Sequence, residues 1–298
     1  MQDKKMNRAA RRAAEKAEKK PSKKQIFAEY GLELKDGKYI YHPVLGWIPL
    51  LIVDGNDKIG SRKTSDDGIG VWHFSTLPSN MVFTAVFHGI EMTEKGTCPC
   101  TCKDKDGKII CYALKGNYQR YGYDSLIWRT WLIRNDLDFV RRALIAQIKA
   151  FEIKFMRWHA SGDFDSRAYI ETVQSVVAEC QDTTFWTYTK VKAAETAFDS
   201  FDNAHIVPSV IDHFGYNFGH ANYILALYEY LKSQGKDVYI CRCGIDKNQH
   251  CNKCTACSNK GTYVLFLEHS TDYNPLEDPL YPEFCRVVEA QGSRFLKK

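Results

Sequence analysis

The sequence predicts an α/β fold in which a mostly parallel sheet, either open or closed into a partial barrel, is connected by helical crossovers. Two observations lead to this fold class. From residue 154 onward, short apolar stretches of strand type alternate strictly with stretches of helical periodicity, which is typical of parallel strands joined by right-handed crossovers. Before residue 90, apolar stretches are separated by Asp-Gly turns, which predicts a smaller mixed β segment.

Each expected element follows from one of these two patterns. The mixed β segment contains strands at 39–41, 48–53, 69–74 and 82–87. Apolar residues at helical spacing then predict helices at 125–133 and 137–151. The alternating region gives strands at 154–159, 184–188, 205–210, 238–241 and 263–267, and helices at 167–178, 193–201 and 221–232.

The N-terminal segment of residues 1–24 carries most of the charge imbalance. It contains ten Lys or Arg and three acidic residues, a net charge of +7, so the remaining residues sum to −2 because the whole chain carries +5. No face of it is apolar, so we expect a flexible basic arm that either contacts nucleic acid or only adds solubility. Residues 25–298 then form a single metal-binding domain, with a β-rich part (25–95) and a cysteine-bearing part (96–298).

The sequence argues against several function classes. No apolar stretch approaches the roughly 18 to 20 residues that cross a bilayer, and no secretory leader is visible, so we expect a cytoplasmic protein without membrane contact. Neither a G-x-x-x-x-G-K-[ST] loop nor a G-x-G-x-x-G turn is present, which argues against an ATP- or NAD-dependent enzyme. A single nucleophilic cysteine is disfavoured because neighbouring thiols compete to bind metal.

Nine of the eleven cysteines lie in two short stretches. A disulfide framework is disfavoured in a chain without a leader. Closely spaced thiols instead suit a soft metal ion or an iron–sulfur cluster, because little loop entropy is lost on bringing them together. The ligands we expect are Cys98, Cys100, Cys102 and Cys111 in a first group, and Cys243, Cys251, Cys254 and Cys257 in a second group.

The cysteine spacing leaves two kinds of metal site open. The second group contains a Cys-x2-Cys-x2-Cys run with a fourth thiol upstream, which favours a cubane iron–sulfur cluster. Structural zinc more often uses two separated Cys-x2-Cys pairs, so zinc is the alternative. The roles of Cys241 and His250, which lie close to this run, stay open.

Polar residues follow the ends of the alternating strands, and parallel strands bring these ends to one edge of the sheet. The residues at this edge are His159, Ser161, Gly162 and Asp163 after the first strand, Lys190 after the second, and Ser209 and Asp212 after the third. We expect Asp163, His159 and Lys190 to be catalytic, and Ser161, Gly162 and Ser209 to bind a cofactor.

These residues also have purely structural explanations. The stretch Ser161–Asp163 can be a tight turn, with Asp165 or Ser166 capping the next helix. A histidine that ends an apolar strand is more often half-buried and hydrogen-bonded than catalytic. Core packing rather than base stacking is the simpler role for three aromatic residues, Trp158, Trp186 and Tyr188.

Four stretches resemble the mycobacteriophage gene product 88 family: Arg157–Phe164, Phe185–Lys190, Cys111–Ala113 and the terminal cysteine run. The resemblance covers roughly residues 96–267. It implies an origin in a phage or mobile element, and it brings no settled biochemical role.

The arrangement is also similar to the radical S-adenosylmethionine barrels, in which a loop after the first barrel strand carries three cluster-binding cysteines and C-terminal cysteines hold an auxiliary cluster. That family spaces its cysteines x3 and then x2, whereas eight residues, with an Asp-Gly pair that predicts a hairpin turn, separate Cys102 from Cys111 here. If Cys98, Cys102 and Cys111 form such a site, one iron stays free to bind S-adenosylmethionine and Cys100 stands aside. If all four thiols bind, the site is closed and structural.

The leading hypothesis is a phage or mobile-element accessory protein that binds iron–sulfur clusters and acts, like a radical S-adenosylmethionine enzyme, on a nucleic acid or nucleotide-related substrate. The alternative is a non-enzymatic zinc protein that binds nucleic acid through the basic arm. The sequence does not decide whether the protein is an enzyme, and it predicts no particular protein partner or oligomeric state.

Overall fold

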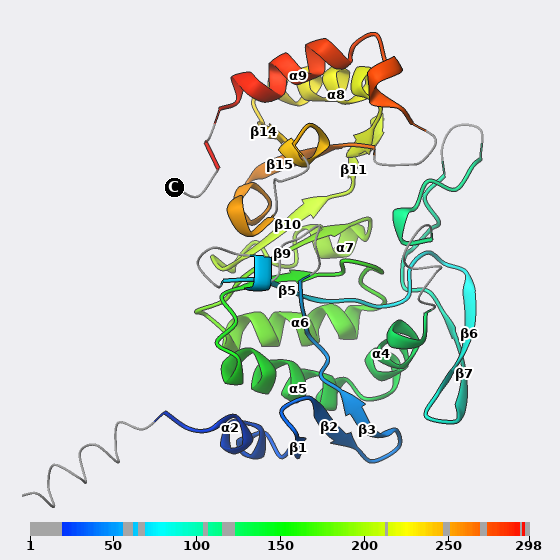
Figure 1. Cartoon of the computed structure of the whole chain (residues 1–298), viewed down its shortest axis with the longest axis vertical. Coiled ribbons are helices and arrows are strands. Elements are labelled where there is room, and N and C mark those ends of the chain that lie inside the picture. Colours follow the sequence, from blue (N-terminus) through cyan, green and yellow to red (C-terminus); the bar gives the residue numbers. More distant parts are fainter. Residues whose placement is uncertain are drawn as a thin grey trace, which may run out of the picture.

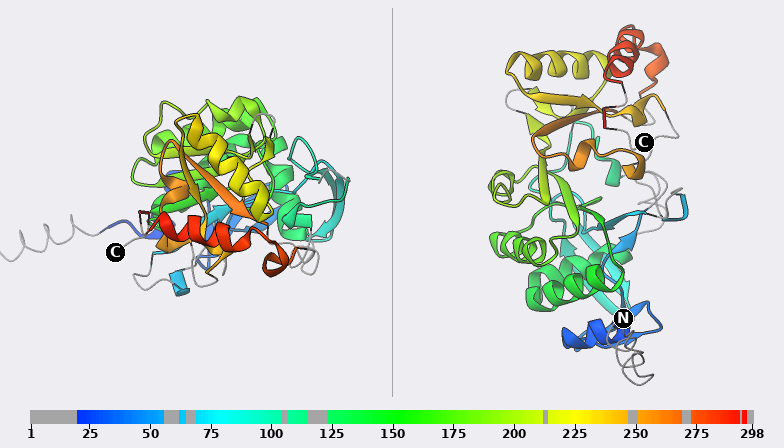
Figure 2. Two further views of the ribbon diagram at one scale, coloured as in Figure 1. Left: turned by 90° about the horizontal axis from the view of Figure 1, so that it is seen from above. Right: turned by 90° about the vertical axis from the view of Figure 1, so that its left-hand side faces the viewer.

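The computed structural model describes residues 20–55, 62–64, 69–103, 107–114, 123–211, 214–246, 251–268, 273–292 and 294–295. These residues form a mixed α/β structure with several sheets that follow one another along the long axis of the molecule (Figure 1). A small N-terminal sheet lies at one end, a five-stranded sheet lies in the middle, and a three-stranded sheet covered by two helices lies at the other end (Figure 2).

The five-stranded sheet has the strand order β10-β9-β8-β5-β4. The first four strands pair in parallel, as the alternating pattern predicts, and β4 runs antiparallel at the edge. Most residues of the inner strands are buried, because helices and loops cover both faces. The bounds are β4 (Val53–Asp54), β5 (Val71–Phe74), β8 (Phe155–Trp158), β9 (Thr184–Thr189) and β10 (Ala204–Pro208).

Helices lie before and between these strands, and α5 and α6 each bury an apolar face in the core. Of the two candidate caps for the helix after β8, the structure uses Ser166, whose hydroxyl accepts a hydrogen bond from the Tyr169 N–H at 3.2 Å. Asp165 is paired with Arg134 instead. The bounds of these helices are α4 (Asp124–Asn135), α5 (Leu137–Ala150), α6 (Arg167–Glu179) and α7 (Lys192–Glu195).

Helix α7 is shorter than the helix expected at 193–201. The chain turns after Thr196 and places Phe198 against Phe164 in the core, with ring centroids 5.7 Å apart. Burial of a phenyl ring therefore outweighs the helical periodicity of this stretch.

A separate parallel sheet of order β13-β15-β14 lies beyond β10, so the single continuous sheet of the sequence prediction is wrong in this respect. The described strands form no closed barrel, although β10 and β15 touch and His205 Nε2 lies 3.1 Å from the Thr262 carbonyl oxygen. The bounds are β13 (Phe218–Gly219), α8 (Ala221–Ser233), β14 (Asp237–Ile240), β15 (Thr262–Leu267) and α9 (Tyr281–Ala290). Between the two parallel sheets, an antiparallel ribbon of β11 (Val210–Ile211) and β12 (Gly215–Tyr216) replaces the expected end of the strand at 205–210.

The N-terminal part is an antiparallel sheet of order β1-β2-β3 beside helix α2. Ser22 and Gln25 form a reciprocal capping box, so α2 begins inside the segment expected to be a flexible arm; residues 1–19 of that segment lie outside the described residues. The strand expected at 48–53 is divided between two sheets: residues 48 and 49 end β3, and residue 53 begins β4. The bounds are α2 (Lys23–Glu29), β1 (Leu34–Lys35), β2 (Tyr39–His42) and β3 (Gly46–Pro49).

The strand expected at 82–87 is confirmed as β6 (Val82–Phe87), and it forms a hairpin with β7 (Ile90–Lys95). The turn residues His88 and Gly89 both have positive φ, as a tight two-residue hairpin requires. Short 3-10 helices complete the description: η1 (Arg62–Thr64), η2 (Tyr112–Leu114), η4 (Arg242–Gly244), η5 (Cys251–Lys253), η6 (Ala256–Ser258) and η7 (Pro275–Glu277). Among the described helices, none has the length and apolar character needed to span a bilayer.

Candidate functional site

The segment that leaves β8 turns sharply and is clamped onto the segment that leaves β5. His159 and Gly162 both have positive φ, and the Thr76 N–H donates to the Ser161 carbonyl oxygen at 3.0 Å. The Asp163 N–H donates to the Thr97 hydroxyl at 2.8 Å. The tight turn expected at Ser161–Asp163 therefore exists, and it fixes the position of Asp163 at the carboxyl end of the sheet.

Replacing Gly162 with alanine should destabilise the protein strongly. A Cβ at this position would overlap the Thr76 hydroxyl and would be held at a φ of +86°, which disfavours L-residues. We expect a loss of at least about 2 kcal/mol in the free energy of unfolding, measured by urea denaturation. The matched variant Gly37→Ala, at a φ of +66° but with open space around the Cβ, should cost clearly less.

Asp163 is fully buried, and donors surround both of its carboxylate oxygens. Oδ1 accepts hydrogen bonds from the Phe164 N–H at 2.9 Å and from the Thr189 hydroxyl at 2.5 Å. Oδ2 accepts one from the Lys190 N–H at 2.9 Å, and the Lys190 ammonium nitrogen lies 4.0 Å away. Burial raises the pKa of Asp163, while Lys190 and these donors oppose that rise. In this arrangement Asp163 orients Lys190 rather than facing an open space.

Lys190 links this carboxylate to the first cysteine group. Burial lowers the pKa of Lys190, but the neighbouring Cys98, Cys102 and Asp163 raise it above its ordinary value overall. The ammonium group is therefore protonated at neutral pH. Only 14% of its side chain is exposed, so it is a largely desolvated cation at the strand ends.

The first cysteine group is assembled by a hairpin. An antiparallel bridge joins Lys103 to Ile109, and the Ile110 N–H donates to the Cys102 carbonyl oxygen at 3.0 Å. These contacts return Cys111 to Cys102, and the hydrogen bond from the Cys102 side chain lowers the pKa of Cys111 to about 7. Cys98 interacts electrostatically with both of these thiols, and burial raises its pKa to about 12.

Cys100 approaches a residue from a distant part of the chain. Its thiol hydrogen-bonds with the Tyr216 hydroxyl, which also hydrogen-bonds with Cys102. Tyr216 belongs to β12, so the ribbon after β10 reaches across to the first cysteine group. The structure therefore groups Cys98, Cys102 and Cys111 beside Lys190, and Tyr216 joins Cys100 to Cys102 of this group.

The second cysteine group comprises five thiols rather than the four expected. The Cys241 and Cys243 sulfur atoms lie 3.1 Å apart, and Cys241 also interacts electrostatically with Cys251 and Cys257. Cys254 interacts with Cys243 and Cys257, which completes the group. Cys241, whose role the sequence leaves open, belongs to this group, whereas His250 and Asp212 lie outside the described residues.

The two groups lie at successive positions along strand β9. The Tyr188 hydroxyl hydrogen-bonds with Cys257 of the second group, and Lys190, two residues further on, interacts with the first group. Helix η6, which carries Cys257, packs against β9, β10 and β15. The second group is therefore placed on the sheet itself, next to the strand ends where the first group lies.

All eleven cysteines are free thiols in the structure. Within the described ranges, no three His, Cys, Asp or Glu side chains have the geometry of a formed metal site. In each group the thiols are neighbours, and their sulfur atoms would have to move closer together to bind a common ion or cluster.

Three other predicted residues are placed near the strand ends with different surroundings. The His159 ring packs between Phe164 and Tyr169, and its Nε2 lies 3.0 Å from the Tyr169 hydroxyl. His159 Nδ1 and Ser161 Oγ are buried and have no hydrogen-bond partner among the described residues. Ser209 is buried, and its N–H donates a hydrogen bond to the Thr189 carbonyl oxygen at 2.7 Å. This bond links the residue after β10 to the end of β9.

The stability of the protein should fall as the pH falls below neutral, because burial, helped by Arg157 and Lys190, lowers the pKa of His159 to about 3. In the unfolded chain His159 binds a proton near pH 6.5, whereas in the folded chain its ring stays neutral down to about pH 3. The stability that the neutral ring contributes is therefore lost as the pH falls from 6.5 to 3. We expect this residue alone to cost about 2 kcal/mol between pH 7 and 5, measured by urea denaturation. His159→Asn tolerates the positive φ and should show a shallower pH dependence; an unchanged slope would contradict this origin.

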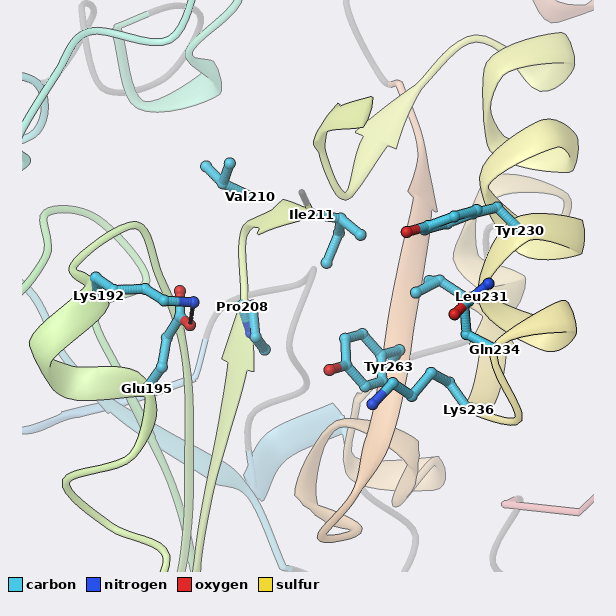
Figure 3. Close-up of a pocket in the computed structure, with 10 residues that line it drawn as sticks. All are labelled: Lys192, Glu195, Pro208, Val210, Ile211, Tyr230, Leu231, Gln234, Lys236 and Tyr263. Atoms are coloured by element: carbon cyan, nitrogen blue, oxygen red, sulfur yellow. Dashed lines mark hydrogen bonds and ion pairs between the residues drawn. The ribbon is translucent and has the colours of Figure 1, made fainter. Parts of the chain in front are cut away.

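A surface cleft that no cysteine lines lies between α7, the end of β10 and α8 (Figure 3). It has a volume of about 330 Å³, and Lys192 forms an ion pair with Glu195 at its rim. Lys236 lies over the Tyr263 ring on its other side. None of the predicted site residues lines this cleft.

Sequence reasoning missed several residues that hold the site together: Thr76, Thr97, Thr189 and Tyr216. Thr189 could have been found, because it directly precedes Lys190 in a stretch already singled out. Tyr216 has no motif around it, and only the folding of the β11–β12 ribbon brings it to the thiols.

Comparisons with known proteins add one finding. A sequence model of the family described as Gene product 88 matches residues 50–264, which is well over half of the chain. No curated protein and no solved structure matched the chain in the same comparisons.

Proposed function

The chain belongs to the gene product 88 family, a phage family named for a gene product rather than for an activity, and we propose that it binds iron–sulfur clusters through its two cysteine groups. One observation carries the proposal: a hairpin returns Cys111 to Cys102, next to Cys98, beside the largely desolvated ammonium group of Lys190. Thiols grouped in this way suit soft metals, which bind thiolate sulfur at about 2.3 Å.

In the first group, the proposed ligands are Cys98, Cys102 and Cys111. Tyr216 hydrogen-bonds with both Cys100 and Cys102, so a closed site that also includes Cys100 stays the alternative. When bound, a cluster with one open iron would supply a position for the amino and carboxylate groups of S-adenosylmethionine and an electron for its cleavage. The contact between β10 and β15 is consistent with the partial barrel that this interpretation requires.

The chain's own residues define what substrate this site would accept. Lys190 is protonated and held by Asp163, so it would attract and orient an anionic group such as a phosphate or carboxylate. Ser161 carries a buried hydroxyl that has no hydrogen-bond partner among the described residues. These features support a nucleic acid or nucleotide-related substrate, with Asp163 as a positioning residue for the lysine.

In the second group, four of five thiols would bind the second cluster. Cys257 is buried and three other thiols of the group are partly buried in a cluster with Trp186 and Tyr188, which supports a site partly shielded from water. Cys243, Cys251, Cys254 and Cys257 are the proposed ligands, and the 3.1 Å approach of Cys241 to Cys243 makes Cys241 the candidate for exchange with it. This many free thiols suits a reducing compartment such as the cytoplasm.

The experiment is purification of the full chain without oxygen, followed by determination of iron, acid-labile sulfide and zinc. The proposal predicts a brown protein with iron and sulfide in equal amounts and little zinc. A colourless protein that contains stoichiometric zinc would instead support the second candidate, a zinc protein that binds nucleic acid. The net charge of +7 in residues 1–24 supports that candidate, because a basic segment attracts the phosphates of nucleic acid.

A further inference from the structure

Two thiols of the second cysteine group are held against each other. Their sulfur atoms lie 3.1 Å apart, and the Cys241 thiol donates its hydrogen bond to Cys243. Joining them in a disulfide bond of about 2.05 Å would shorten this distance by about 1 Å. The Cα atoms of residues two positions apart are separated by at most about 7 Å, which is close to the range of about 4.4 to 6.8 Å that disulfide bonds span.

The backbone on both sides of this pair is fixed by the fold. Cys241 directly follows strand β14, and its N–H donates to the Leu265 carbonyl oxygen of β15 at 2.8 Å. Cys243 lies in the short helix η4, where the Ile245 N–H donates to the Arg242 carbonyl oxygen at 2.9 Å. Because the chain between the two cysteines is this short and already placed, little chain entropy would be lost on joining the two sulfur atoms.

The second group also has one thiol more than a closed metal site uses. Zinc sites and cubane clusters in proteins are held by four cysteines, and this group contains five. Cys241 and Cys243 are both partly exposed, so an oxidant in solution has access to them, whereas Cys257 is buried. Oxidation of the exposed pair would therefore compete with metal binding by the group.

We propose that Cys241 and Cys243 form a reversible disulfide bond when the second group holds no metal, so that the oxidation state of this pair controls metal binding there. The oxidant is a small disulfide such as oxidised glutathione. The sulfur of Cys243, which accepts the hydrogen bond, attacks one sulfur of this disulfide as a thiolate and releases one glutathione thiol. The sulfur of Cys241 then attacks the Cys243 sulfur in the mixed disulfide and releases the second. Two protein thiols are oxidised, one small disulfide is reduced, and the two protons pass to the glutathione thiols.

The disulfide bond would change what the group can bind. It leaves Cys251, Cys254 and Cys257, which is one thiol fewer than a closed site needs, and reduction restores the fourth. A bound metal would in turn protect Cys243 from the oxidant, because a ligand sulfur is not free to attack. The formation of the bond does not depend on which metal the protein binds, whereas its effect on an iron–sulfur cluster rests on the proposed function.

The test treats the full chain with oxidised glutathione after a chelator has removed its metal, and then uses alkylation, trypsin and mass spectrometry to locate disulfide bonds. Trypsin cleaves after Arg242, between the two cysteines, and places them in the peptides 237–242 and 243–247, neither of which contains another cysteine. The proposal predicts that these two peptides are joined, with a loss of two alkylatable thiols. Dithiothreitol should reverse both effects.

Two variants and the metal-loaded protein complete the test. Cys241→Ser should give no joined peptides and should keep glutathione attached to Cys243. Cys285→Ser, the matched control, removes a partly exposed thiol outside both groups and should give the joined peptides as the unaltered chain does. The protein that keeps its metal should give roughly 10-fold less of the joined peptides than the metal-free chain.

Three results would overturn the proposal: no joined peptides from the metal-free chain, Cys241 or Cys243 bonded to other cysteines instead, and equal yields with and without bound metal. The outcome is separate from that of the proposed function. Joined peptides from a chain that binds zinc would keep this inference and remove the iron–sulfur proposal, whereas an iron-containing chain that never gives them once its iron is removed would do the reverse.

Discussion

Asp163→Asn should lower the free energy of unfolding by about 3 kcal/mol, because it removes the carboxylate that Lys190 faces in a buried site. Three donors now point at the carboxylate: the Phe164 N–H, the Lys190 N–H and the Thr189 hydroxyl. The NH₂ group of the asparagine is itself a donor, so at least one of these three would lose its acceptor. The size of the effect follows from leaving a largely buried ammonium group without its counter-charge. Urea denaturation at neutral pH measures it directly.

Asp182→Asn is the control, because Asp182 is an exposed carboxylate in the loop before β9 and should change stability by less than about 0.5 kcal/mol. A second variant, Lys190→Met, removes the ammonium group instead of the carboxylate. Combined with Asp163→Asn, it should cost clearly less than the two single effects added together. Strict additivity, or an Asp163→Asn protein as stable as the unaltered one, would show that this pair does not stabilise the strand ends.

Cys102→Ala should remove the iron and sulfide of one cluster and leave those of the other. Cys102 interacts with both Cys98 and Cys111 in the first group, and none of the interactions described for it reaches the second group. Cys254→Ala should remove the other cluster in the same way. Iron and sulfide determination on the anaerobic protein, with electron paramagnetic resonance of the reduced samples, measures both.

Cys285→Ser is the matched control for these variants, since Cys285 is a half-buried thiol on α9 outside both groups. It should keep the full iron and sulfide content. If Cys102→Ala loses all the iron, the two groups form a single site, and if it loses none, the first group is not a ligand set.

The parallel sheet and the edge that carries Asp163 and Lys190 could be predicted from the sequence. Alternation of strands and helices identified β8, β9 and β10, and the geometry of parallel strands then placed Asp163 and Lys190 at one end. The Asp-Gly pair between Cys102 and Cys111 likewise indicated the hairpin that the Lys103–Ile109 bridge shows. These predictions depend on local periodicity and turn chemistry, which the sequence carries directly.

The rest depends on tertiary contacts that no local pattern encodes. Strand β7 is polar, Ile-Glu-Met-Thr-Glu-Lys, and is held by pairing with β6 rather than by an apolar alternation of its own. The separation of β13, β14 and β15 into their own sheet depends on strand order, which succession along the chain does not determine. Tyr216 reaches Cys100 only because the β11–β12 ribbon folds back toward the first group.

The sequence pattern of residues 1–24 predicts only a flexible basic arm. The capping box at Ser22 shows that an ordered helix begins within this basic segment. The aromatic residues Tyr39 and Tyr41 were assigned simply to a strand, because a short strand with apolar residues at every position gives no sign of which face is open. The register with β3 decides that question.

X-ray absorption at the iron and zinc edges of the anaerobically purified full chain tests the central claim most directly. The account predicts iron surrounded by sulfur at about 2.3 Å, with an additional iron neighbour that identifies a cluster. The Cys102→Ala and Cys254→Ala proteins should each keep this environment at lower iron content. Zinc bound by four sulfurs without iron, or iron bound by nitrogen and oxygen alone, would contradict the account.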